Sequence, residues 1–177
     1  AAIEARHAGA EVLVIEKMRT HGGNSIINGG EMAVAGTKWQ KEAGIQDSPE
    51  LFMKDLLKAG SNLNHPELAR TIAEQSGEAL DWCQNFVGAK FVKLVFHGGH
   101  SVKRSVQTDN ASGSGLVNPL FAKAKSMGVK FQFTTKMERL ITSKEGRVVG
   151  LEIRKGYKFP DDRSGKASFV KARKAVV

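Results

Sequence analysis

The chain has 177 residues, 41% of them hydrophobic, which is enough for a domain with its own core. Its net charge of +9 could attract phosphates or acidic substrates, but no aromatic residues are interleaved with the basic ones, which argues against nucleic-acid binding. No apolar run approaches the ~20 residues that span a membrane, and the single Cys83 excludes an internal disulfide.

The first predicted elements are a helix and a buried strand. The alanine-rich residues 1–8 favour a helix that ends at Gly9. The four apolar residues 12–15 are typical of a parallel strand covered on both faces. Glu16 closes this strand at its carboxyl end, where a carboxylate can accept both hydroxyls of an adenosine ribose. The alternative is an ordinary helix–strand pair followed by a solvent-facing Glu-Lys.

This order of helix, strand and acid is the second half of a dinucleotide-binding βαβ unit. The strand and glycine-rich turn that open such a unit are not in the sequence. We therefore expect the chain to be a piece of a larger flavoprotein. Because that turn and its helix N-terminus are the main anchor of a pyrophosphate, we expect the chain alone to retain FAD weakly or not at all.

Two glycine pairs follow the strand. Gly22-Gly23 leads into Asn24-Ser25, and Asn28 leads into Gly29-Gly30. Glycines let backbone N–H groups approach a ligand without a side chain in the way. Their spacing after a strand-terminal acid favours contact with a flavin cofactor. The alternatives are an ordinary Asx-type turn at Asn24-Ser25 and a simple tight loop at Gly29-Gly30.

The rest of the chain divides into a helical and a mixed segment. Ser48 and Pro49 suit an N-cap and a first helical position, and residues 64–67 repeat that signal, so helices are expected across 48–87. Ser112-Gly113-Ser114-Gly115 is either a flexible loop or an anion cradle at a helix N-terminus. Further elements are expected as a helix over 117–127, strands over 130–141, 148–156 and 167–177, and a turn over 160–165.

A series of short motifs in one order gives the chain a family resemblance. They are Ile15-Glu16-Lys17, the loop 22–30, Gly36-Thr37-Lys38, 47–51, 73–82, 98–104 and Lys155-Gly156-Tyr157. With them the chain resembles the flavin domain of flavocytochrome c fumarate reductases and related FAD-dependent C=C reductases. The resemblance implies an α/β fold, α+β in part: an incomplete FAD-binding Rossmann-like domain with a helical excursion and a β-meander. We expect three segments, 1–47, 48–90 and 91–177.

The resemblance also implies a role for individual residues in holding FAD. Glu16, with Lys17 beside it, would bind the adenosine ribose, and the adenine would rest against the strand that contains Met137. The pyrophosphate and ribityl chain would be lined by Gly22, Gly23, Asn24 and Ser25, and the isoalloxazine would run alongside Asn28, Gly29 and Gly30.

The chain departs from the family pattern at two positions. Glu31 stands where many relatives have glycine, and Val106 stands where a histidine often follows Arg104. The first departure bears on how closely a flavin can approach. The second suggests a substrate other than fumarate.

In this family the flavin N5 delivers hydride to the double bond of an unsaturated carboxylate, and the groups that bind the carboxylate and donate the proton lie further along the chain. We therefore expect no catalytic residue here, and only His97 and Arg104 as substrate-side candidates. The alternatives are a surface-loop role for His21, His65 and His97 and a solvated charge for Arg104. No metal site is expected, because no third ligand completes the pair His97 and His100.

Three functions follow as hypotheses. The first is a fragment of a fumarate reductase-like enzyme that contains FAD, receives electrons from haem groups or a cytochrome-type donor, and resides in the periplasm as the resemblance implies. The second is a flavoprotein dehydrogenase of the same fold, of the ketosteroid or succinate type. The third is a non-catalytic α+β module with an incomplete cofactor site.

Overall fold

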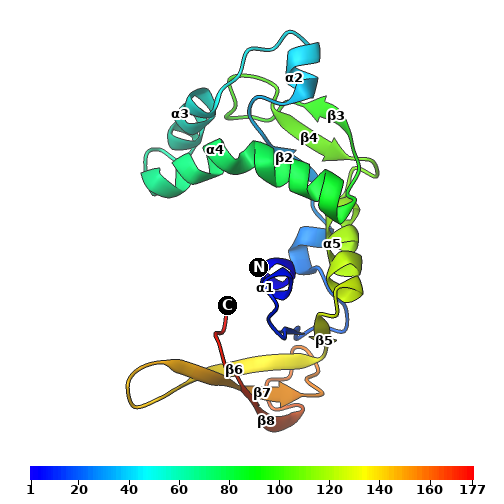
Figure 1. Ribbon diagram of the computed structural model, residues 1–177, viewed down its shortest axis with the longest axis vertical. Coiled ribbons are helices and arrows are strands. Elements are labelled where there is room, and N and C mark those ends of the chain that lie inside the picture. The colour runs from blue at the N-terminus through cyan, green and yellow to red at the C-terminus, as the bar shows by residue number, and fades with distance from the viewer. The chain divides into compact units, whose positions relative to one another are not determined.

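A computed structural model describes residues 1–177, and its contacts divide the chain into two compact units (Figure 1). The first unit combines Ala1–Gly23 with Phe121–Val177, and the second is Asn24–Leu120. These boundaries differ from the three consecutive segments expected from the sequence. Two stretches far apart in the chain pair in the first unit, and the glycine-rich loop divides between Gly23 and Asn24.

The first unit begins with the expected helix and strand. Helix α1 (Ala2–His7) is followed by Gly9 with a φ of +82°, the left-handed conformation in which helices commonly end. Strand β1 (Leu13–Ile15) pairs in parallel with β5 (Lys130–Gln132). The parallel pairing is as predicted, but the covering of both faces is not. Leu13 is 40% exposed, because this sheet has only two strands and few neighbours to cover it.

The second sheet of this unit is an antiparallel meander of β6 (Thr135–Thr142), β7 (Val148–Lys155) and β8 (Lys166–Lys171) (Figure 1). The expected strand over 130–141 is in fact two strands, because Thr134 takes a φ of +48° between them. The last strand ends at Lys171, six residues earlier than expected. The meander itself and the turn before β8 are confirmed.

The second unit is built on a three-stranded antiparallel sheet that the sequence did not reveal. Its order is β2 (Glu31–Ala33), β4 (Ser105–Thr108) and β3 (Phe91–Val95). Its buried core comprises Val34, Leu80, Cys83, Ala89, Phe91 and Val106. Val106, one of the two departures from the family pattern, is therefore a fully buried core residue.

Three α-helices of this unit show different N-terminal caps. Helix α2 (Lys38–Glu42) has a capping box between Thr37 and Gln40. Helix α3 (Pro49–Ala59) has the predicted cap, in which the Leu51 N–H donates to the Ser48 hydroxyl over 3.2 Å. Helix α4 (Pro66–Asp81) begins after His65, whose side chain makes no capping bond.

The remaining helices are two short ones, η1 (Gly23–Ile26) and η2 (Trp82–Val87), and the longer α5 (Ser114–Ser126). Helix α4 continues into the π-helical turn η2, and the 3-10 helix η1 opens the second unit. Helix α5 contributes its first residues to the second unit and its last residues, from Phe121, to the first. No helix combines the length and apolarity needed to cross a membrane.

The net positive charge lies in one unit. The first unit contains 18 basic and 8 acidic residues, whereas the second contains 9 basic and 10 acidic residues. The first unit thus carries a formal charge of +10 and the second −1, which together give the +9 of the chain.

Candidate functional site

Glu16 lies where the sequence placed it, directly after β1. Its backbone N–H donates to the Gln132 carbonyl over 3.0 Å, and its own carbonyl accepts from the Thr135 N–H over 2.9 Å. The residue is therefore fixed by main-chain bonds to β5 and β6. One carboxylate oxygen, Oε1, accepts from the Met18 N–H over 2.7 Å, and Oε2 remains available to a ligand.

Lys17 and Met137 belong to the same unit as Glu16. The Lys17 ammonium lies 5.7 Å from the Phe159 ring centroid, and the side chain is exposed. Met137 is 46% exposed on β6, two residues beyond the Thr135 that bonds Glu16. The expected contact with adenine is through the backbone of this part of β6, residues 136–138, which stays a prediction.

The first glycine pair has the backbone conformation that glycine favours. Gly22 and Gly23 have φ values of +107° and +50°. A Cβ placed on Gly23 would meet no atom within 4 Å, so the space beside it is open. The next residues, Asn24 and Ser25, are exposed on η1. An open glycine turn that ends in two exposed polar side chains fits the expected approach of a phosphate-bearing chain.

The second glycine pair is shaped by the Asn28 side chain. Its Oδ1 accepts from the Gly30 N–H over 2.7 Å, and its Nδ2 donates to the Ser25 carbonyl over 3.0 Å. Asn28 therefore closes a tight loop at Gly29-Gly30, which was the alternative expected there, and does so through an Asx-type bond that the sequence had suggested at Asn24-Ser25 instead. Ile27, within this loop, is 77% exposed, which leaves an apolar surface beside the polar turn.

The serine-glycine segment before α5 packs against this loop. The Gly113 N–H donates to the Asn28 carbonyl over 2.9 Å, and the Ser112 hydroxyl donates to the Ile26 carbonyl over 3.1 Å. A Cβ on Gly113 would overlap the Ser25 carbonyl oxygen. The segment thus supports the glycine loop, a role that neither sequence interpretation included. The only signal for it was a glycine directly before a helix.

Arg104 occupies a buried ion-pair cluster in the second unit. Its Nη2 lies 3.0 Å from Asp47 Oδ1 and 2.9 Å from Asp55 Oδ2, and its guanidinium carbon lies 4.6 Å from the Phe52 ring centroid. The side chain is fully buried, so its interpretation as a solvated charge is wrong. Because two carboxylates already neutralise it, the geometry argues against substrate contact as well. Both aspartates were missed as functional partners of Arg104.

The surroundings of this cluster set two pKa values. Burial raises the pKa of Asp55, but the bonds from the Ser101 N–H and hydroxyl and the charge of Arg104 outweigh it and leave the pKa below its usual 3.8. Burial and the nearby Arg104 lower the pKa of His100 below its usual 6.5. His100 also packs edge-on against Phe52, with ring centroids 5.8 Å apart.

The other histidines take different positions. His97 is half-exposed, and its Nε2 lies 3.1 Å from Glu31 Oε2. His21 lies in a loop, as expected, where it is half-buried and its ring stacks on Phe121 with ring centroids 3.8 Å apart. His65 is exposed, as that interpretation expected. No three ligating side chains come together as a possible metal site.

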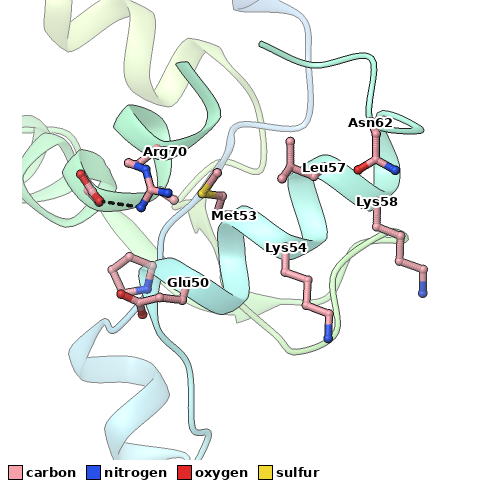
Figure 2. A pocket seen from close by; sticks show the side chains of 10 residues that line it. Glu50, Met53, Lys54, Leu57, Lys58, Asn62 and Arg70 are labelled. Carbon is pink, nitrogen blue, oxygen red and sulfur yellow. Dashed lines mark ion pairs between the residues drawn. The ribbon is translucent and has the colours of Figure 1, made fainter. Parts of the chain in front are cut away.

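A cavity of about 580 Å³ lies between α3 and α4 in the second unit (Figure 2). Met53 and Leu57 line it with apolar atoms, and Figure 2 shows Lys54 and Lys58 along the same helix. Arg70 is paired with Glu74 over 3.6 Å on the other helix. None of the expected cofactor or substrate residues lines this cavity.

A carboxylate at the carboxyl end of a parallel strand, with an open glycine turn behind it, is the arrangement typical of a nucleotide-binding domain of a flavoprotein. The chain belongs to the FAD binding domain family, whose model matches residues 1–177. FAD is therefore its cofactor, and the predicted mixed α/β fold is confirmed.

Similar proteins agree with this assignment. The acrylate reductase flavoprotein subunit of Shewanella woodyi is 39% identical over 178 residues, which cover 100% of this chain and 35% of that protein. The open conformation of a flavocytochrome c3 fumarate reductase superposes with a TM-score of 0.88 at 29% identity, over 99% of this chain and 30% of that one. The 3-ketosteroid-Δ4-(5α)-dehydrogenase of Rhodococcus jostii RHA1 superposes with a TM-score of 0.83 at 27% identity, over 97% of this chain and 41% of that one.

These matches confirm the resemblance to fumarate reductase flavin domains that the sequence motifs indicated. The chain spans about a third of the length of the curated relative at 39% identity and a similar share of the flavocytochrome.

Proposed function

We propose that this chain is the FAD-binding part of an oxidoreductase that reduces the C=C bond of an unsaturated carboxylate. The observation that carries the proposal is Glu16, fixed at the carboxyl end of β1 with one carboxylate oxygen available. The likeness to proteins named for acrylate and fumarate reduction supports the substrate class.

In this proposal the chain's own residues bind and orient the cofactor. Glu16 accepts the ribose hydroxyls, with Lys17 beside it, and the adenine rests against the backbone of β6 around Met137. The Gly22–Ser25 turn lines the pyrophosphate and ribityl chain, where the backbone can approach closely because no Cβ intervenes. The Asn28–Gly30 loop borders the isoalloxazine. When bound, FAD supplies hydride transfer to the alkene.

No residue of this chain is proposed to donate the proton or hold the substrate carboxylate. Arg104 is occupied by two aspartates, and His97 is paired with Glu31. Of the two substrate-side candidates, only the half-exposed His97 could still border a substrate. We extend the proposal to a cytochrome-type electron donor, for which the likeness to a flavocytochrome is the support. A periplasmic location rests on the family resemblance alone.

A second candidate is a dehydrogenase that works in the opposite direction on a steroid-like substrate. The likeness to the ketosteroid dehydrogenase, at 27% identity, supports it. Two assays of the full-length protein separate the candidates. Oxidation of a reduced viologen dye that depends on an alkenoic acid supports the reductase. Reduction of an acceptor dye that depends on a 3-ketosteroid, without the first activity, supports the dehydrogenase.

Substitution of the ribose-binding acid tests the cofactor site itself. Glu16→Ala in the full-length protein should lower FAD affinity, measured by the quenching of flavin fluorescence. Glu145→Ala, at the exposed β6–β7 turn, is the matched control and should leave affinity unchanged. Equal affinities for the two variants would contradict the role of Glu16.

A further inference from the structure

The residue that departs from the family pattern, Glu31, lies against the second glycine pair. It opens β2 directly after the loop that ends at Gly30. A Cβ placed on Gly29 would be 2.8 Å from Glu31 Oε2, so the carboxylate covers one side of that glycine. Glu31 thus brings a negative charge to the segment that would border the isoalloxazine.

Two neighbours hold this carboxylate in place. Gln107 Nε2 donates to Glu31 Oε1 over 2.7 Å and to the Gly29 carbonyl over 3.2 Å, so one amide group joins the charge to the glycine loop. His97 Nε2 lies 3.1 Å from the other carboxylate oxygen. The Glu31 side chain is 26% exposed, although the residue as a whole is exposed, so water screens part of its charge.

We propose that Glu31 lowers the reduction potential of the FAD bound beside Gly29 and Gly30. The inference rests on the proposed function, since it requires the isoalloxazine at this loop. Reduction brings two electrons and one proton to the flavin, which leaves one added negative charge on the ring. A fixed carboxylate nearby repels that added charge and so favours the oxidised cofactor.

The decisive experiment measures the midpoint potential of bound FAD in the full-length protein, by stepwise reduction with dithionite beside a dye of known potential. Glu31→Gln removes the charge and keeps an oxygen that can accept from Gln107. We expect its potential to rise by about 30 mV, which is a tenfold shift toward the reduced flavin for a two-electron couple. Glu78→Gln removes the same charge from the exposed face of α4 and should not move the potential.

A second variant guards against misfolding of the first. Glu31→Gly introduces the residue that many relatives have at this position and should raise the potential in the same direction. The inference is overturned if FAD remains bound in both Glu31 variants at the wild-type potential, or if Glu78→Gln shifts the potential equally. Wild-type protein that binds no FAD would instead overturn the proposed function.

Discussion

Arg104 and Asp55 form an ion pair of 2.9 Å in which neither side chain is more than 7% exposed. The pair joins the start of β4 to the middle of α3, and Asp47 lies 3.0 Å from the same guanidinium nitrogen. A buried charge is stable only while its partners remain. The second unit therefore depends on this cluster for its fold.

Removal of the shared cation should destabilise the second unit strongly. Arg104→Met leaves two buried carboxylates without their counter-charge, and loss of one partner of a buried pair costs about 3–5 kcal/mol. The free energy of unfolding, from urea titration, measures the loss. Lys103→Met changes the exposed neighbour and should cost less than about 0.5 kcal/mol. Similar losses of unfolding free energy in both variants would show that the buried ion pairs of Arg104 do not stabilise the fold.

Acid should weaken the same cluster. The pKa of Asp55 lies below its usual 3.8, so its ionised form is stabilised by folding. This stability is complete above the unfolded pKa and is lost as the pH falls through the lower, folded pKa. Urea midpoints measured from neutral pH to below 3.8 should therefore fall less steeply with acid in Asp55→Asn than in the wild type. Parallel curves would contradict the assigned pKa shift.

A methyl group at Gly113 should disturb the proposed cofactor loop. It would overlap the Ser25 carbonyl oxygen, and the displaced backbone should cost about 1–3 kcal/mol and weaken FAD binding. Unfolding free energy and FAD affinity are both measured.

The control for this change is Gly77, a glycine inside α4. A Cβ on Gly77, inside α4, would meet nothing within 4 Å. Gly77→Ala should therefore stabilise the protein by about 0.5–1 kcal/mol, since alanine favours helix more than glycine does. If alanine at Gly113 and alanine at Gly77 both lowered FAD affinity, the loss could not be assigned to the clash between Gly113 and Ser25.

Helices α3 and α4 should respond differently to loss of the residue that precedes their first turn. Ser48→Ala removes a capping bond to the Leu51 N–H and should cost about 1 kcal/mol. His65→Ala removes no capping bond and should cost much less. Thermal unfolding of the two variants compares them directly. The opposite order would mean that His65 stabilises α4 in another way.

The sequence revealed elements whose signals are local. The cap at Ser48 and the stop at Gly9 identified their helix ends, and both are present in the structure. The sheet of β2, β4 and β3 was missed because its strands are only three to five residues long and because β2 pairs with β4 across more than 70 residues of chain. Arg104 was misread for a similar reason, since its two aspartates lie far away in sequence.

The candidate site follows the same division. The position of Glu16 at a strand end could be predicted, because the apolar run before it is a local signal. The support of the glycine loop by Gly113 and Gln107 could not, because no pattern links residue 29 to residues 80 positions away.

The surplus of positive charge in the first unit has a consequence for how this protein responds to ionic strength. With 18 basic residues against 8 acidic ones, that unit experiences electrostatic self-repulsion that the nearly neutral second unit does not. Dissolved counterions screen such repulsion over about 10 Å at 0.1 M salt. Moderate salt should thus stabilise the first unit and leave the stability of the second unit nearly unchanged.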